Sequence, residues 1–283
     1  LIICSLLDQP RWLEARYLYD ARGSDLFEQI CELPEYYLTR TENDLLERHS
    51  DAIVEASGLR CLVEIGAGFS VKTRHLLNSL VRQHQGGQFV PIEVSLSALQ
   101  GSRTAVQKEF PEIEFTGLHA PLEVAMPDLD PDLPKMILFL GSSIGNFMRA
   151  ELVHFLSGLS LAMGPRDTLL LGVDRIKEEG VIRAAYDDSK GVTGQFIMNS
   201  LDSVNRITGS DFDQSLFRYT PRFNRGWSQM EMILTCTESH LVDFPSVRQQ
   251  VCWEKGEELL VEVSRKFDPI RLGHQMRAFG LRS

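Results

Sequence analysis

Between residues 61 and 173, short apolar runs alternate with longer amphipathic segments, and this alternation restricts the possible folds more than any other feature of the sequence. The apolar runs cover 61–65, 89–94, 114–119, 136–140 and 168–173. Helical patterns lie between them near 71–84, 96–108 and 150–162. Strands that are separated by helices pair in parallel, because each helix returns the chain across a face of the sheet. The sequence therefore predicts the α/β fold class.

The segments on either side of this core follow other patterns. Two helices are predicted before it, over 24–32 and 41–57. After it the pattern predicts one helix over 178–206 and a turn-rich segment up to residue 225. Three strands are predicted next, over 230–236, 240–244 and 259–263. Helices followed by antiparallel strands indicate an inserted α+β subdomain.

The composition is that of a folded, acidic chain. Hydrophobic residues make up 43% of the 283 residues, which is enough for a buried core. The formal net charge of −10 repels nucleic-acid phosphates, so a small-molecule partner is expected and nucleic acid is not. The longest clean apolar run, 136–140, is far shorter than the roughly 20 residues that span a bilayer, and the first residues lack the basic region of a signal peptide. No membrane partner is expected.

Cysteine and histidine positions bear on the compartment and on metals. The five cysteines form no CxxC pair, and an odd number at scattered spacing indicates reduced thiols and a cytoplasmic location. The seven histidines show no spacing typical of zinc ligands, so no metal is expected. We expect a monomer.

A turn with two glycines follows the first strand of the predicted sheet. Gly66 and Gly68 let the backbone approach a ligand at the carboxyl end of the strands, where parallel sheets bind ligands. Val71 stands where a dinucleotide fingerprint has its third glycine, which disfavours NAD. Glu93 ends the next strand, where a carboxylate can accept both hydrogen bonds of a ribose diol. Because the sequence also lacks a phosphate-binding lysine motif, these features favour S-adenosylmethionine (SAM) over other nucleotides. A plain tight turn and a solvated carboxylate are the structural alternatives.

Longer strings, which run from about residue 17 to 281, resemble the histidine-specific SAM-dependent N-methyltransferases of ergothioneine biosynthesis. The N-terminal strings are Tyr19-Asp20-Ala21-Arg22-Gly23-Ser24-Asp25-Leu26-Phe27, Leu33-Pro34-Glu35-Tyr36-Tyr37 and Thr39-Arg40-Thr41-Glu42. The central strings are Phe139-Leu140-Gly141-Ser142-Ser143-Ile144-Gly145-Asn146, Ala185-Tyr186-Asp187-Asp188 and Gly191-Val192-Thr193. The C-terminal strings are Met230-Glu231-Met232, Gly256-Glu257-Glu258-Leu259 and Glu262-Val263-Ser264-Arg265-Lys266-Phe267.

This resemblance implies a class I, Rossmann-like methyltransferase sheet with an inserted subdomain that recognises the substrate. The expected methyltransferase domain comprises residues 1–42, 60–174 and 266–283, and the expected subdomain comprises 43–59 and 175–265. The implied reaction transfers methyl groups from SAM to the α-amino group of L-histidine, up to the trimethylated betaine hercynine.

The resemblance also assigns residues to the site. Cofactor binding falls on Tyr19, Gly66, Gly68, Lys72, Glu93 and Leu122. The α-amino and α-carboxylate groups of the substrate fall to Tyr36, Gly141, Asn146 and Tyr186, and its side chain falls to Met232, Glu262 and Ser264. No catalytic acid or base is implied, since Tyr19, Tyr36 and Asn146 act by positioning.

The chemistry of Glu262 and Ser264 fits an imidazole. Glu262 can accept a hydrogen bond from a ring N–H, and Ser264 can donate to the other ring nitrogen. The two residues are two apart on a predicted strand, so both side chains point to the same face. Taken one by one, these residues also suit plain structural roles, with Glu262 as a solvated carboxylate and Asn146 as a helix cap.

Three departures from the family pattern limit what the resemblance implies. Ala120-Pro121-Leu122 replaces the Asp and aromatic pair expected beside the adenine, and Glu123 is the alternative acceptor. Arg265 stands where a small residue is expected. The sequence ends before the final strands expected of the sheet, so those strands lie outside it or the sheet edge differs.

Two other functions stay open. A relative of the same family could methylate a tryptophan-derived amino acid, although an indole lacks the second ring nitrogen that Ser264 would contact. Alternatively, the protein could bind SAM without turnover.

Overall fold

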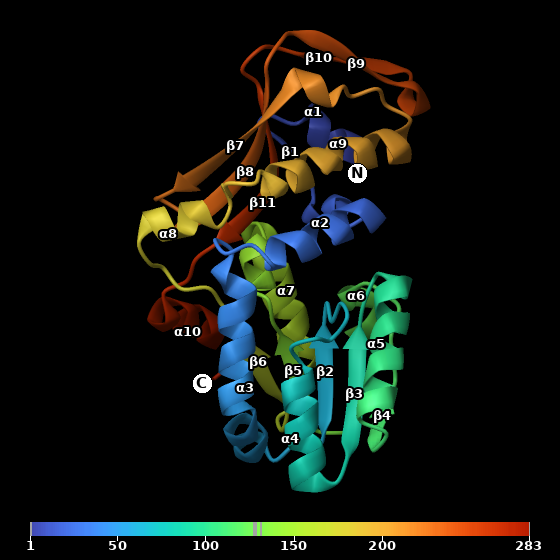
Figure 1. The fold of residues 1–283 in the computed structure, drawn as a ribbon, viewed down its shortest axis with the longest axis vertical. Coiled ribbons are helices and arrows are strands. Elements are labelled where there is room, and N and C mark those ends of the chain that lie inside the picture. The colour runs from blue at the N-terminus through green and yellow to red at the C-terminus, as the bar shows by residue number, and fades with distance from the viewer. Residues whose placement is uncertain (1, 127–128, 131, 283) are drawn as a thin grey trace. The chain divides into compact units, whose positions relative to one another are not determined.

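Figure 1 shows the computed structural model, which describes residues 2–126, 129–130 and 132–282. The chain forms two compact units, each built around its own sheet. The parallel-sheet unit comprises Leu38–Asp174 and Asp268–Ser283. The antiparallel-sheet unit comprises Leu1–Tyr37 and Arg175–Phe267.

The parallel-sheet unit contains a five-stranded sheet in the order β4-β3-β2-β5-β6, and all neighbouring strands are parallel. Its strands are β2 (Cys61–Ile65), β3 (Gly87–Ile92), β4 (Ile113–Phe115), β5 (Met136–Phe139) and β6 (Thr168–Leu171). Its helices are α3 (Tyr37–Ser57), α4 (Arg74–His84), α5 (Leu96–Glu109), α6 (Leu122–Ala125), the 3₁₀-helix η3 (Ser143–Asn146), α7 (Arg149–Ala162) and α10 (Pro269–Ala278). The first strand lies centrally and the order reverses beside it, as in doubly wound α/β proteins. The predicted α/β class with a Rossmann-like sheet is confirmed.

Successive side chains of β5 are buried on opposite faces of this sheet. Leu138 belongs to a core cluster that includes side chains of α3, α4 and α5. Phe139 packs on α7, where its ring centroid lies 4.8 Å from that of Phe155. Helices therefore cover both faces, and all residues of β2 and β5 are buried. This burial explains why both strands show nearly unbroken apolar runs in the sequence.

The antiparallel-sheet unit contains a four-stranded sheet in the order β1-β11-β8-β7 and a separate two-stranded sheet of β9 and β10. Its strands are β1 (Arg11–Trp12), β7 (Phe217–Asn224), β8 (Gln229–Cys236), β9 (His240–Phe244), β10 (Gln249–Trp253) and β11 (Glu258–Arg265). Its helices are α1 (Ile2–Leu7), α2 (Ala21–Cys31), α8 (Glu179–Ala184), α9 (Val192–Thr208) and the 3₁₀-helices η1 (Ala15–Leu18), η4 (Gln214–Leu216) and η5 (Pro245–Val247). Strand β11 pairs antiparallel with β8 and parallel with the short β1.

The single helix predicted over 178–206 is wrong, because two helices, α8 and α9, occupy this stretch. Gly191 adopts a φ of +69° directly before α9. The Asp188 carboxylate accepts the backbone N–H groups of Val192 and Thr193, both at 2.8 Å, and so caps the start of α9. The turn-rich segment predicted after this region contains β7.

The compact units divide the chain differently from the predicted domains. Residues 1–37 group with the antiparallel sheet, because β1 pairs with β11 and α2 packs on α9. Residues 43–59 group with the parallel sheet, because α3 is one continuous helix that contributes Leu46 and Val54 to the core of that unit. The assignment of cofactor and substrate roles to the two parts of the chain stays a prediction.

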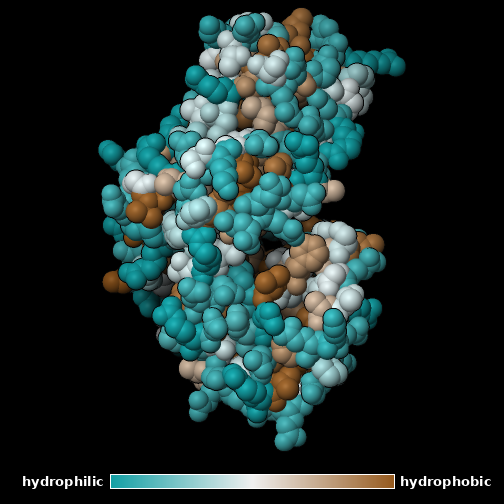
Figure 2. Space-filling model, viewed as in Figure 1, coloured by the Kyte–Doolittle hydropathy of each residue, from teal (hydrophilic) through white to brown (hydrophobic). Residues whose placement is uncertain are grey.

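The C-terminal part of the chain is helical, and the face of the molecule seen in Figure 2 is mostly hydrophilic. Within residues 268–282 the chain forms α10 and adds no strand to the five-stranded sheet. Among the described residues, no helix is both long and apolar enough to cross a membrane. Hydrophilic side chains cover most of the face shown in Figure 2.

Candidate active site

The loop after β2 provides open space beside its backbone. Gly66 and Gly68 have φ angles of +65° and +52°, which residues other than glycine rarely adopt. A Cβ built on either glycine meets no atom within 4 Å. The Gly66 N–H donates to the carbonyl of Ile92 at 2.9 Å, which ties the loop to the end of β3. A ligand can therefore approach this backbone closely.

Glu93 follows β3 and faces the same loop. Its Oε2 accepts the Gly68 N–H at 2.8 Å, and its Oε1 accepts the Ser95 N–H at 2.9 Å. The residue is 9% exposed. Each carboxylate oxygen has a second acceptor position, which suits a pair of ribose hydroxyls. The parallel pairing of β2 and β3 thus brings the predicted glycine turn and the predicted acid together.

A third group of the parallel-sheet unit consists of Lys72, Glu42 and Gly141. The Lys72 ammonium forms an ion pair with Glu42. The backbone N–H of Gly141 also donates to the two carboxylate oxygens of Glu42, with N···O distances of 2.8 and 2.9 Å. A ligand that uses Lys72 or this N–H must share it with Glu42. Sequence reasoning did not select Glu42, because only the fold brings it to these distant residues.

A buried carboxyl lies beneath the glycine loop. Glu64 of β2 is 4% exposed, and its Oε1 accepts the Thr73 hydroxyl at 2.5 Å. Its Oε2 has no hydrogen-bond partner among the described residues. Burial raises the pKa of Glu64 to about 7.

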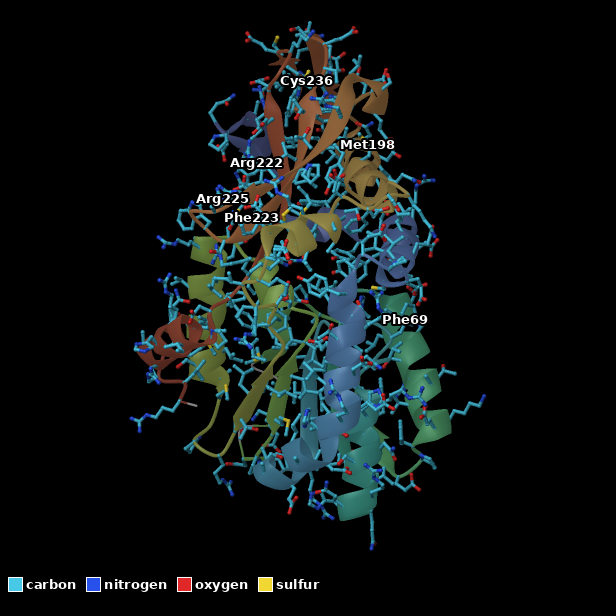
Figure 3. All side chains as sticks on the ribbon, turned by 60° about the vertical axis from the view of Figure 1, so that its left-hand side comes forward. Phe69, Met198, Arg222, Phe223, Arg225 and Cys236 are labelled. Atoms are coloured by element: carbon cyan, nitrogen blue, oxygen red, sulfur yellow. The ribbon has the colours of Figure 1, made fainter. Side chains whose placement is uncertain are left out.

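The remaining predicted residues of this unit lie in short helices. Leu122 is the first residue of α6, which follows Pro121, and it is half-buried. Asn146 ends η3. The side chain of Glu123, the alternative adenine acceptor, lies outside the described part of the chain. Phe69, labelled in Figure 3, follows the glycine turn and its ring lies against Gly101 of α5.

These residues fit SAM. The loop offers open backbone, Glu93 offers acceptors for a ribose, and Lys72 offers a donor. The carboxylate of Glu93, which has no cationic partner among the described residues, also favours a ligand that carries a sulfonium cation.

In the antiparallel-sheet unit, aromatic rings form a row. Tyr19 packs edge-on against Phe27, with ring centroids 5.6 Å apart. Phe27 lies 6.3 Å from Tyr36, and Tyr36 lies 6.1 Å from Tyr186, again edge-on. Burial raises the pKa of Tyr36 well above the usual range, and nearby Glu262 adds to this effect. The pKa of Tyr19 shifts in the same direction through partial burial and Glu262, although 40% of this residue is exposed. Both phenols therefore stay neutral donors at physiological pH.

Strand β11 carries Glu262 and Ser264, two of the residues predicted to contact the substrate side chain. Glu262 pairs directly with Met232 of β8, so their side chains are neighbours on one face. Ser264 lies two residues further along β11, and its Oγ is 2.7 Å from the hydroxyl of Tyr186. Burial raises the pKa of Glu262 to about 8, although Lys266 acts in the opposite direction. The structure thus brings Tyr19, Tyr36 and Tyr186 together with Met232, Glu262 and Ser264.

Four residues that contact this cluster were not predicted as site residues. Phe27 and Phe196 contact Tyr19, and the Tyr219 hydroxyl donates to the carbonyl of Tyr186 at 2.7 Å. The Lys266 ammonium donates to the Tyr186 hydroxyl at 2.7 Å and to Ser264 Oγ at 2.9 Å. Phe27 and Lys266 lie within the strings that carry the family resemblance, which is the one sequence signal that points to them.

A separate open groove lies on the same unit. It is lined in part by Arg222 and Phe223 of β7 and by Arg225, which follows β7; all three are labelled in Figure 3. Arg222 forms ion pairs with Glu231 and Glu258, and Glu179 forms ion pairs with Arg183 and Arg225, so each arginine of this groove has a carboxylate partner. We do not assign a function to it. Among the described residues no group of three or more His, Cys, Asp or Glu could hold a metal ion.

A doubly wound sheet whose strand ends carry an open glycine loop and a carboxylate with further acceptor positions suits a SAM-dependent methyltransferase. The family model described as "Histidine-specific methyltransferase, SAM-dependent" matches residues 1–283, and the chain belongs to this family.

Three relatives have informative names. Histidine N-alpha-methyltransferase of Mycobacterium tuberculosis is 37% identical and covers 99% of this chain and 87% of its own length. The protein of the same name from Mycolicibacterium smegmatis is 38% identical and covers 96% and 85%. Ergothioneine biosynthesis protein 1 of Neurospora crassa is 34% identical and covers 71% of this chain and 24% of its own length.

Proposed function

We propose that this protein transfers methyl groups from SAM to the α-amino nitrogen of L-histidine, one after another, until the trimethylated betaine hercynine is formed. This reaction would serve ergothioneine biosynthesis, as the names of two kinds of relatives suggest. The observation that carries the proposal is the placement of Glu262 and Ser264 on one face of β11, beside the row of tyrosines. An acceptor and a hydroxyl at this spacing match the two nitrogens of an imidazole.

The residues of the chain would act by position and not by covalent chemistry. SAM supplies a methyl group on a sulfonium, which a neutral amine can attack in line. Neutral phenols such as Tyr36 and Tyr186 orient the α-carboxylate and the amine without changing their own charge. Holding the amine at attack distance accounts for the acceleration, because the reactants then lose little further freedom. The participation of Asn146 and Gly141 in substrate binding remains part of this proposal.

Mass spectrometry of the products tests this function. The protein is incubated with SAM and histidine, and in parallel with tryptophan or phenylalanine. We expect histidine carrying one, two and finally three methyl groups. A product from tryptophan alone would favour the tryptophan-type relative, and SAM binding by calorimetry without any product would favour a binding protein. Accumulation of the singly methylated product would contradict the trimethylation step.

We also propose that the protein acts in the cytoplasm as a monomer. The five cysteines are an odd number at scattered positions without a CxxC pair, which suits a reducing compartment. Analytical ultracentrifugation would test the assembly, and a dimer would contradict it.

A further inference from the structure

Lys266 is a buried cation beside the proposed imidazole pocket. Its side chain is 2% exposed, and a buried ammonium is stable only where hydrogen bonds replace its water. It donates to the Tyr186 hydroxyl at 2.7 Å and to Ser264 Oγ at 2.9 Å, and its Nζ lies 4.7 Å from the centre of the Tyr186 ring. The two hydroxyl oxygens are themselves 2.7 Å apart. The three groups form a closed triangle.

The hydrogens of this triangle can be counted. An ammonium only donates, so both hydroxyl oxygens accept from Lys266. One of the two hydroxyls then donates to the other. A phenol is a stronger hydrogen-bond donor than an aliphatic hydroxyl, so Tyr186 donates to Ser264. Ser264 Oγ thus accepts twice, which fills both of its acceptor positions, and its own hydrogen points to a third group.

We propose that Lys266 is a positioning residue that makes Ser264 a donor towards the substrate ring and thereby selects the neutral imidazole. This inference rests on the proposed function. Because Ser264 donates, the ring nitrogen that faces it must carry no hydrogen, while the other nitrogen gives its N–H to Glu262. A neutral imidazole has one nitrogen of each kind, whereas an imidazolium has two N–H groups and leaves the Ser264 hydrogen opposed to a donor. The charge of Lys266 disfavours a second cation nearby as well.

Either form of Glu262 is compatible with this arrangement. An ionised carboxylate accepts at both oxygens, and a protonated carboxyl still accepts at its carbonyl oxygen. The direction of the hydrogen bonds is therefore set at Ser264, through Lys266. Tryptophan is disfavoured by the same device, because its indole has an N–H and no bare nitrogen.

Nitrogen NMR of bound histidine tests the proposal directly. Histidine labelled with ¹⁵N in the ring is bound to the protein saturated with S-adenosylhomocysteine, so that no turnover occurs. At pH about 6, below the ordinary imidazole pKa of about 6.5, most free histidine is charged. We expect the wild-type complex to show one protonated and one bare ring nitrogen. A bound imidazolium in the wild type would overturn the proposal without any variant.

Three variants separate positioning from folding. Lys266→Met should bind a ring with both nitrogens protonated and should lose about tenfold in histidine affinity, the equivalent of one hydrogen bond. Lys266→Arg keeps the charge and the donors, so it should restore the neutral ring. Lys255→Met removes an exposed lysine of the same unit and should match the wild type.

The outcomes distinguish this inference from the proposed function. If the wild type neither binds nor methylates histidine, both are wrong. If the wild type methylates histidine and Lys266→Met still binds a neutral ring with unchanged affinity, only the role of Lys266 is wrong. Should Lys266→Met fail to fold by circular dichroism, the wild-type spectrum and Lys266→Arg still decide the question.

Discussion

At the scale of single residues, Glu93 holds the glycine loop, and we propose that it also binds the ligand. Its two oxygens accept the backbone N–H groups of Gly68 and Ser95, and the acceptor positions that remain suit the ribose of SAM. On this proposal, loss of the carboxylate removes ligand contacts and also releases the glycine loop.

We expect Glu93→Ala to weaken SAM binding by about 1.5–3 kcal/mol, the range for hydrogen bonds to a charged group. Titration calorimetry measures the effect. Glu55→Ala, which removes an exposed carboxylate from α3 of the same unit, should leave SAM affinity unchanged. Unchanged affinity in a folded Glu93→Ala protein would remove Glu93 from the cofactor site.

Glu262 should determine which amino acid is methylated. Glu262→Ala leaves an enclosed imidazole N–H without an acceptor, so kcat/KM for histidine should fall by the equivalent of about 1.5–3 kcal/mol. Tryptophan should lose little, because its ring gains from the absence of a desolvated carboxyl. Steady-state kinetics with both substrates measure this difference.

Glu258→Ala is the matched control, since Glu258 is an exposed carboxylate on the same strand. An equal loss of kcat/KM for both substrates in Glu262→Ala would show that Glu262 supports the fold and does not distinguish imidazole from indole.

Site residues could be predicted where a short stretch of sequence marks them and not where their contacts are distant in the sequence. Gly66, Gly68 and Glu93 could be selected because a turn and a strand end are visible in the sequence. Glu42 could not, because it lies 30 residues from Lys72 in the sequence and the two meet only when the unit has folded. Lys266 reads as an ordinary surface lysine, since the sequence does not show that its partners Tyr186 and Ser264 will enclose it.

At the scale of elements, the turn between α8 and α9 shows how two residues replace a continuous helix. Asp188 caps α9, and Gly191 takes a left-handed conformation directly before it. The apolar pattern continues on both sides of the turn, so periodicity alone predicted one helix over 178–206. Strand β7 was missed because Phe217 is its one buried residue and because it contains Pro221, which an edge strand tolerates.

Two glycine substitutions should therefore act in opposite directions. Gly191→Ala forces a Cβ into the left-handed region, and we expect it to lower the free energy of unfolding by about 1–2 kcal/mol. Gly158 lies inside α7 with open space around it, so Gly158→Ala should raise that free energy by about 0.4–1 kcal/mol. Urea unfolding measures both. A neutral Gly191→Ala would show that the turn relaxes without cost.

At the scale of the whole molecule, each unit contains a buried carboxyl with a raised pKa. Burial raises the pKa of Glu64 to about 7 and that of Glu262 to about 8, from an ordinary 4.5. The folded protein therefore binds more protons than the unfolded chain between pH 4.5 and these values, so stability is lost as the pH rises through this window.

We expect the melting temperature to fall between pH 5 and 8 and the fall to be smaller in Glu64→Gln. An amide cannot ionise, so the variant should avoid roughly 1–3 kcal/mol of destabilisation at the upper end of the window. Differential scanning calorimetry at several pH values measures it, with Glu55→Gln as the exposed control. A parallel pH profile in Glu64→Gln and the wild type would contradict the shift.

The fold of the molecule was predictable in part for a physical reason. The parallel sheet is buried on both faces, so its strands leave strong apolar runs in the sequence. The grouping of residues 1–37 with the antiparallel sheet was not predictable, because the pairing of Arg11 with Leu259 is a long-range contact without a local pattern.

That pairing has a consequence for synthesis of the protein. Strand β1 leaves the ribosome long before β11, its partner, has been translated. At about 5–20 residues per second, the delay is roughly 12–50 s. During this time Leu6, Leu13 and Leu18, which are nearly inaccessible in the folded protein, lack their final surroundings. The nascent N-terminal segment is therefore expected to need a chaperone that binds apolar chains until translation reaches β11.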